Sequence, residues 1–272
     1  MAITHTNHAN ANTNGNTSQA VMSLTFTAKA GRTVLGHRTH QGGLALQKPL
    51  YPERHRHICH ALVLYTPAGI VQGDELTMNF VLKANTHAVL TTTGAGKWYG
   101  LGQQVGDDNR HDGVNAGRGD RAIHSAHHTN NAEDTDNPSH ANSHAKPAYQ
   151  HIIAHVADGA VLEWLPQESI YYRRACADSV NRFYVADTAG LITWDMGVLG
   201  RRAFGECFDV GRIYNAWQIW RNDTLLMYDC IDEMAGSGWF DGMLGLGGQS
   251  VFGTLYAVPS LARIHLPIGQ PN

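Results

Sequence analysis

Residues 55–60 (HRHICH) form a dense group of side chains that can bind metal ions. His55, His57, Cys59 and His60 stand at positions i, i+2, i+4 and i+5, and imidazole and thiolate ligands suit Ni²⁺, Cu²⁺ or Zn²⁺. The same pattern is typical of exposed histidines in a loop that enters a strand, and we favour this simpler interpretation. His55, His57 and His60 therefore form an alternative set of metal ligands.

Four carboxylates lie among glycine or apolar residues, where an unpaired charge is costly. A structural ion pair or a hydrogen bond to loop amides explains each of them, for example with Arg201 or Lys97 as the partner. A second interpretation is that their oxygens act as ligands along a route for a metal ion. The four carboxylates are Asp74, Glu163, Glu168 and Glu206.

The sequence offers no nucleotide-binding loop and no serine nucleophile. Residues 93–98 (TGAGKW) contain the Gly-Lys of a P-loop, but Trp98 replaces the hydroxyl residue and Thr91 replaces the first glycine. Residues 245–247 (GLG) do not lie between a strand and a clear helix, so they do not form a dinucleotide-binding loop. A G-x-S-x-G nucleophile motif does not occur.

The composition excludes several classes of protein. The chain has 272 residues, of which 43% are hydrophobic and 16% are charged, and its formal net charge is -3. Such a chain can bury a large core but lacks the basic surface of a nucleic-acid-binding protein. It contains neither an apolar run of membrane-spanning length nor an N-terminal signal peptide. Its four cysteines form no CxxC pair and are typical of buried free thiols in a cytoplasmic protein.

Two segments lack the apolar side chains that an ordered core requires. Residues 1–20 are rich in Asn and Thr, and residues 102–147 are rich in His, Asn and Asp. We expect a disordered tail at 1–20 and a disordered insertion at 102–147 within a single domain that spans 21–272. Eight of the 17 histidines lie in these segments, two in the tail and six in the insertion, which accounts for much of the high histidine content.

The rest of the chain has the pattern of β-strands. Leu76, Met78, Phe80 and Leu82 alternate with their neighbours at the period of two that a half-buried strand shows, and residues 24–28 do the same. No segment keeps a helical period over four turns, although 236–248 could form a short helix or a packed loop. Strands at this spacing favour an antiparallel sandwich, a barrel or a stacked-sheet fold. Further strands are expected at 58–65, 88–93, 149–156, 160–165, 182–186, 191–194, 214–220, 224–228, 251–258 and 262–266.

Six ordered blocks of this sequence resemble the urease accessory protein family UreD, called UreH in some species. The most distinctive are 67–74 (PAGIVQGD), 91–99 (TTTGAGKWY) and 159–170 (GAVLEWLPQESI). The other blocks are 31–35, 46–53 with 59–60, and 200–201 with 205–208. The motif positions that the resemblance points to as structural or partner-binding residues are Tyr51, Pro52, Glu53, Gly69, Gly73, Lys97, Trp164, Pro166, Gln167 and Arg201.

The resemblance implies a non-enzymatic chaperone that helps to load nickel into apo-urease. Its partners would be the accessory protein UreF, the GTPase UreG and the urease subunits, and GTP hydrolysis would belong to UreG. It implies a mainly β fold, an elongated stack of sheets like a β-helix, with few short helices and a single domain. Nickel would bind only transiently, no cofactor would be tightly bound, and Asp74, Glu163, Glu168 and Glu206 would be candidates for the nickel path.

Two departures from the family pattern and two alternative functions remain. The family has a short turn where this chain has residues 102–147, and it continues past 251–258 with helical, tryptophan-containing sequence that this chain lacks. The first alternative is a metal-dependent hydrolase with His55, His57 and His60 as ligands. The second is a nickel-storing module that uses the histidines of the insertion.

Overall fold

The computed structural model describes residues 18–53, 58–100 and 146–260. Most of the expected tail and insertion, His55 and His57, and the strand expected at 262–266 lie outside these residues. The first strand begins at Gln19, inside the segment that we expected to be a disordered tail.

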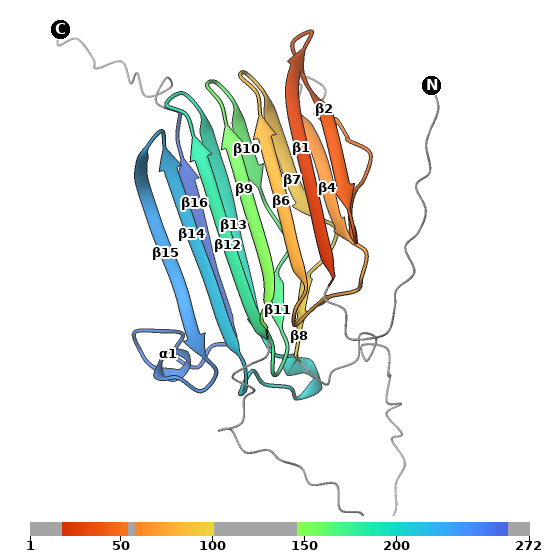
Figure 1. Cartoon of the computed structure of the whole chain (residues 1–272). Coiled ribbons are helices and arrows are strands. Elements are labelled where there is room, and N and C mark those ends of the chain that lie inside the picture. The colour runs from red at the N-terminus through yellow and green to blue at the C-terminus, as the bar shows by residue number, and fades with distance from the viewer. Residues whose placement is uncertain (1–17, 54–57, 101–145, 261–272) are drawn as a thin grey trace, which may run out of the picture.

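The described residues form two mixed β-sheets that pack face to face (Figure 1). Sheet A contains, in spatial order, β15 (Thr224–Met234), β14 (Arg212–Arg221), β12 (Cys176–Val185), β9 (Ala148–Val156), β6 (Glu75–Leu82), β1 (Gln19–Lys29) and β2 (Arg32–Gln41). Sheet B contains β3 (Leu44–Leu46), β4 (Cys59–Tyr65), β7 (His87–Thr92), β10 (Val161–Trp164), β13 (Gly190–Leu199), β11 (Ser169–Tyr171), β8 (Gly96–Tyr99) and β5 (Ile70–Val71), with β16 (Val251–Val258) paired to β13. The helical elements are α1 (Gly238–Asp241) and a 3₁₀ turn at Arg202–Phe204. The expectation of a mainly β fold with few short helices is confirmed.

The chain winds between the two sheets like a coil. From β4 to β14 it passes alternately through sheet B and sheet A, so most neighbours within a sheet run in the same direction. An antiparallel arrangement was therefore the wrong expectation for most of the fold, because each turn after β6, β9 and β12 leads to the opposite sheet and not to a neighbouring strand. The stacked-sheet, β-helix-like alternative is the correct one.

Sheet B divides into two arms on one side of β13. One arm is β10-β7-β4-β3 and the other is β11-β8-β5, and β13 pairs with both of them. Three passes of the chain cross from the first arm to the second through bends at 66–69, 93–95 and 165–168. These three bends lie within the family-like blocks 67–74, 91–99 and 159–170 or next to them.

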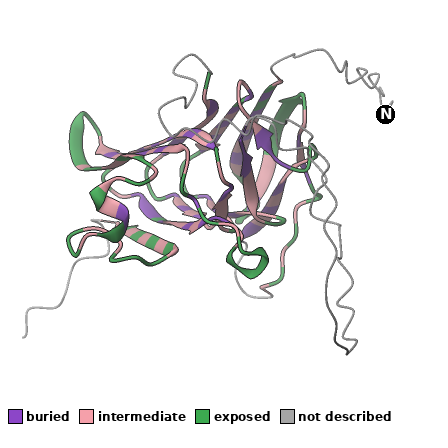
Figure 2. Ribbon diagram, turned by 90° about the horizontal axis from the view of Figure 1, so that it is seen from below, coloured by how far each residue is buried: buried purple, intermediate pink, exposed green. Residues whose placement is uncertain are grey.

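The hydrophobic core lies between the sheets. Leu76, Met78, Phe80 and Leu82 are all buried, as their alternation predicts. Phe80 of sheet A packs on Trp164 of sheet B with ring centroids 5.3 Å apart. Figure 2 shows the buried residues on the two facing layers and much of the exposed surface at the loops and at one end. Burial of each large apolar side chain contributes about 1.5–3 kcal/mol to folding.

All four cysteines are free thiols, as expected, but only Cys59 is buried and Cys207 is exposed. Residues 236–248 contain the one-turn helix α1, which buries Phe240, followed by turns in which Met243 and Leu244 are exposed, so the short helix is present and these two residues do not pack. Within the described part of the chain, no helix is long and apolar enough to span a membrane.

Candidate functional site

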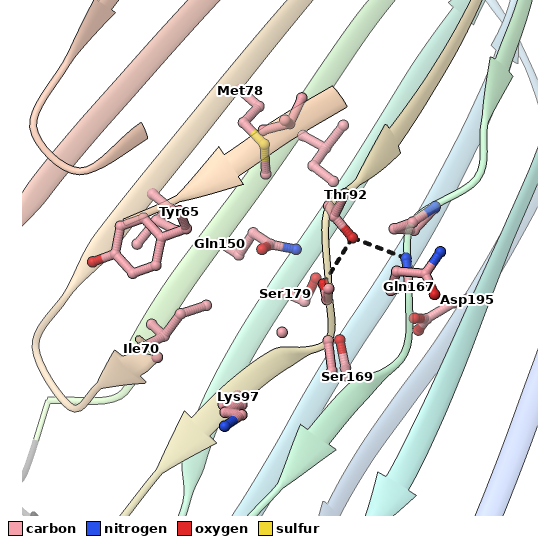
Figure 3. A pocket seen from close by; sticks show the side chains of 18 of the residues that line it. Tyr65, Ile70, Met78, Thr92, Lys97, Gln150, Gln167, Ser169, Ser179 and Asp195 are labelled. Carbon is pink, nitrogen blue, oxygen red and sulfur yellow. Dashed lines mark hydrogen bonds between the residues drawn. The ribbon is translucent and has the colours of Figure 1, made fainter. Parts of the chain in front are cut away.

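A cavity of about 270 Å³ lies between the sheets, next to the three bends of sheet B (Figure 3). A volume of this size accommodates several water molecules or a hydrated ion. Its walls are partly apolar, with side chains such as Met78 and Trp164. Its polar lining comes from both sheets and comprises Tyr65, Thr92, Thr93, Lys97, Gln150, Gln167, Ser169, Ser179, Asn181 and Asp195.

The bends that border the cavity are tied to one another. Thr92 donates a hydrogen bond to the carbonyl of Gly94 (3.0 Å) and accepts one from the backbone N–H of Gln167 (2.9 Å), as Figure 3 shows. The third bend is also held from the side, because the Trp194 indole N–H donates to the carbonyl of Pro166 (2.8 Å). Hydrogen bonds therefore join the second bend to the third and the third bend to β13.

The first bend depends on a glycine. A Cβ atom at Gly69 would lie 2.1 Å from a ring carbon of Tyr99, so no side chain fits there. Four residues on, Gly73 adopts a φ of +90°, which favours glycine. Both residues belong to the block 67–74. Glycine stands at position 69 because a side chain would overlap Tyr99, and at position 73 because the backbone has a positive φ.

A buried polar network crosses the interior from sheet A to sheet B. The Asn181 amide donates to Ser179 Oγ and to Asn215 Oδ1, each at 3.3 Å. Asn215 in turn donates to a carboxylate oxygen of Asp195 on β13. Ser179, Asn181 and Asn215 are buried, and Asp195 keeps accessible surface because it borders the cavity.

Asp195 is the carboxylate that the sequence analysis missed. Burial raises its pKa, while hydrogen bonds from Asn215 and from the backbone of Met196 act in the opposite direction. One signal could have revealed it. Leu191, Thr193 and Leu199 alternate as the buried side of β13, and Asp195 stands in the same phase.

Asp74, the first of the four predicted carboxylates, is buried behind Tyr65 and does not itself line the cavity. It accepts hydrogen bonds from the backbone N–H groups of Ser18 (3.0 Å) and Val71 (3.1 Å) and from the Tyr65 hydroxyl (3.4 Å). Tyr65 lines the cavity, and burial together with the charge of Asp74 raises the pKa of its hydroxyl to about 12. Asp74 thus makes the loop-amide contacts that the simpler interpretation predicts.

The other three carboxylates lie apart from one another. Glu163 alternates with the buried Leu162 and Trp164, and it contacts His87 at 2.7 Å. Glu206 accepts two hydrogen bonds from the Arg201 guanidinium (2.7 and 2.9 Å) and one from a backbone N–H (2.9 Å). Glu168 is half-buried beside the third bend. Their part in a nickel path stays a prediction.

Of the three histidines in the alternative set of metal ligands, the structure describes only His60. His55 and His57 lie outside the described residues, and His60 contacts Glu53 at 2.7 Å. No three His, Cys, Asp or Glu side chains of the described residues come close enough together to hold a metal ion.

Other motif residues support the fold around the site. The Arg32 guanidinium lies 3.8 Å from the ring centroid of Tyr51, which joins the first two family-like blocks. The guanidinium of Arg201 also packs on Tyr172, 4.8 Å from its ring centroid. Pro52 is exposed.

Residues 18–269 match the model of the family described as UreD urease accessory protein. The chain belongs to the UreD family. It is 43% identical to "Urease accessory protein UreD 2" of Psychrobacter cryohalolentis over 239 residues, which is 86% of this chain and 70% of that protein. It is 34% identical to UreD of Acinetobacter baumannii and 36% identical to UreD of Cupriavidus pinatubonensis, each over 88% of this chain and 68% of the relative. The expected resemblance is confirmed.

The cavity is lined by residues from the sequence blocks that resemble the UreD family. Gly69, Lys97, Trp164, Pro166 and Gln167 come from three separate family-like blocks, and all five line this one cavity. The fold therefore brings together motif residues that are far apart in the sequence.

Proposed function

We propose that this UreD chain assists urease maturation as a non-enzymatic chaperone. In this proposal it scaffolds delivery of nickel to apo-urease together with UreF, UreG and the urease subunits. The observation that carries the proposal is the convergence of three family-like blocks on one polar-lined cavity between the sheets.

The chemistry of the lining suits a cargo ion that must leave again. Asp195, Asn181, Ser179 and Ser169 offer oxygen atoms, which bind Ni²⁺ less tightly than imidazole or thiolate ligands do. A site built from such groups holds nickel briefly, and this agrees with our expectation of transient binding without a tightly bound cofactor. The carboxylate of Asp195 supplies a negative charge where a divalent cation would pass.

Asp74 has a positioning role in this proposal. Its hydrogen bonds join the start of β1 to the turn after β5, so it fixes the rim of the cavity next to Tyr65. Glu163, Glu168 and Glu206 remain candidates for contacts along the remainder of the path, including those made with partner proteins.

The test is co-expression of the chain with urease and the other accessory proteins. Asp195→Asn keeps the size of the side chain and an acceptor for Asn215 but removes the charge. We expect about a tenfold or greater loss of nickel per urease active site, with the accessory complex still recovered by affinity purification. Asp187→Asn, at an exposed turn, is the matched control and leaves nickel content unchanged.

Two results count against the proposal. If urease matured with Asp195→Asn contains as much nickel as urease matured with the wild-type chain, the cavity is not part of the route by which nickel is delivered. An equal loss of nickel and of complex assembly shows that Asp195 supports only the structure of the chaperone.

A further inference from the structure

Within the described part of the chain, the cavity between the sheets reaches the surface on the side of sheet B. Its lining residues on sheet A, such as Ser179 and Asn181, are buried. The exposed residues of its lining all belong to the three bends of sheet B, and they are Ala68, Thr93, Gly94 and Gln167. The mouth of the cavity therefore lies between the three bends.

The second bend is held at its ends but only weakly at its centre. The backbone N–H groups of Thr93 and Gly96 donate hydrogen bonds to backbone carbonyls outside the bend (3.2 and 2.8 Å), which fixes both ends. At the centre, residues 94–95 make one hydrogen bond with the rest of the described chain. The Thr92 hydroxyl donates this bond to the Gly94 carbonyl (3.0 Å). One side chain thus secures the part of the bend that borders the mouth.

The structure does not require the two glycines of this bend. Neither Gly94 nor Gly96 has a positive φ. A Cβ atom at Gly94 would meet no other atom within 4 Å, and one at Gly96 would make only ordinary contacts, the nearest at 3.7 Å. Gly69 and Gly73 differ from them, because the first is needed for packing and the second for its φ. Glycine lowers the stability of a conformation that alanine can also adopt. Two such glycines in one short bend indicate a backbone that also adopts a second conformation.

We propose that residues 94–95 form a gate at the mouth of the cavity and that Thr92 is its latch. In the structure the gate is closed, since Thr92 joins the Gly94 carbonyl to the Gln167 N–H of the third bend (Figure 3). When the hydroxyl releases both groups, residues 94–95 move away from the third bend while β7 and β8 stay paired within sheet B. The inference rests on the proposed function for the identity of the cargo, because the gate regulates access to the same cavity.

Opening this gate disturbs little of the fold. Both hydrogen bonds of Thr92 lie at the exposed surface, where water replaces a lost partner, so opening leaves no buried polar group unpaired. Gly94 and Ala95 have no large side chain, so their movement exposes little apolar surface. A segment with few buried contacts is the kind that opens locally without unfolding of the whole protein.

A cysteine placed inside the cavity measures the opening. Ser179→Cys in the full chain puts a thiol on a buried side chain of the lining that is similar in size. The rate at which iodoacetamide alkylates position 179, followed by mass spectrometry of peptides, reports access through the mouth. The native Cys59 is buried and reports unfolding of the whole chain in the same sample. We expect position 179 to react faster than Cys59.

Two changes in the second bend should alter this rate in opposite directions. Thr92→Val keeps the shape of the side chain but removes both hydrogen bonds, and it should raise the rate at position 179 about tenfold without changing the rate at Cys59. Thr91→Val, on the same strand but outside the lining, is the matched control and leaves the rate unchanged. The double variant Gly94→Ala/Gly96→Ala fits the closed conformation and restricts the backbone, so it should lower the rate about threefold or more.

Two results would overturn the proposal. An unchanged rate at position 179 in Thr92→Val, or in the double glycine variant, shows that access does not depend on this bend. Equal acceleration of position 179 and Cys59 by Thr92→Val shows unfolding of the chain and not a gate. Because the reagent contains no nickel, a failed gate leaves the proposed nickel delivery standing. Conversely, a failure of Asp195→Asn to lower the nickel content of urease leaves the gate standing.

Discussion

Asn215 on β14 donates a hydrogen bond to Asp195 on β13, and this bond links the interior faces of the two sheets. The pair ends a chain of hydrogen bonds that begins at Ser179 and passes through Asn181. A buried network of this kind fixes how the sheets lie against each other, since every member needs its partner. It also places a carboxylate beside the cavity, where burial opposes its negative charge.

Asp195→Asn should stabilise the isolated protein at neutral pH by about 1–2 kcal/mol. Burial raises the pKa of Asp195 in the folded state, so the carboxyl group stabilises the fold below its unfolded pKa, and this stabilisation is lost as the pH rises through the folded pKa. The advantage of the variant should therefore be largest at pH 7 and shrink toward pH 3.5. Denaturant unfolding at several pH values measures it. A variant less stable than wild type at pH 7 would contradict the prediction.

Gly69→Ala should destabilise the fold by about 1–3 kcal/mol, because the new methyl group would overlap the ring of Tyr99. Gly94→Ala is the matched control in the next bend, where a Cβ atom meets no other atom within 4 Å. Thermal unfolding of the two variants should show a clear loss for the first and little change for the second. Equal melting temperatures would refute the tight packing of the first bend.

Tyr65→Phe should reduce the loss of stability at alkaline pH. The folded-state pKa of about 12 lies above the usual value of 10.0, so the neutral hydroxyl stabilises the fold below pH 10 and this contribution is lost between pH 10 and 12. Urea unfolding at pH 9 and pH 11 should show a smaller difference for the variant than for wild type. Identical differences would mean that Tyr65 ionises as freely in the folded chain as in the unfolded one.

Glu206→Gln should cost about 1–3 kcal/mol of folding free energy. The Arg201 guanidinium would keep its charge but lose a partly buried carboxylate that accepts two of its hydrogen bonds. Asp209→Asn tests the more exposed pair with Arg173 and should change stability by less than about 0.5 kcal/mol. Chemical unfolding of both variants gives the comparison, and a larger loss at Asp209 would contradict it.

The strands were predictable from the sequence, but their directions were not. The alternation in 76–82 identifies β6 and its buried face, because a strand buried on one side needs an apolar residue at every second position. Parallel pairing depends on which sheet each strand joins. Turns such as 83–86 and 157–160 do not reveal this, since a tight turn can lead to a neighbouring strand or across to the opposite sheet.

The site was predictable in part for a related reason. Gly69, Lys97 and Gln167 were singled out as motif residues, and the fold gathers them at the cavity. Glu163 was singled out on its local surroundings, and the structure places it beside His87. Asp195 and Asn215 were missed because their importance comes from a contact between strands of two different sheets, which no local pattern records.

The coiled path of the chain also sets the order in which the protein can fold as it is synthesised. β1 begins at residue 19, but its parallel neighbour β6 spans residues 75–82. The other neighbour of β6 is β9, where Tyr149 pairs with Glu75 of β6, so β6 stays unpaired on that side until β9 has been synthesised. Contacts between such distant parts of a chain form slowly, and the unpaired strands remain exposed meanwhile. We therefore expect a ribosome-bound chain of this kind to carry unpaired, apolar strands for much of its synthesis, and we expect the yield of folded protein to depend on temperature and on the speed of translation.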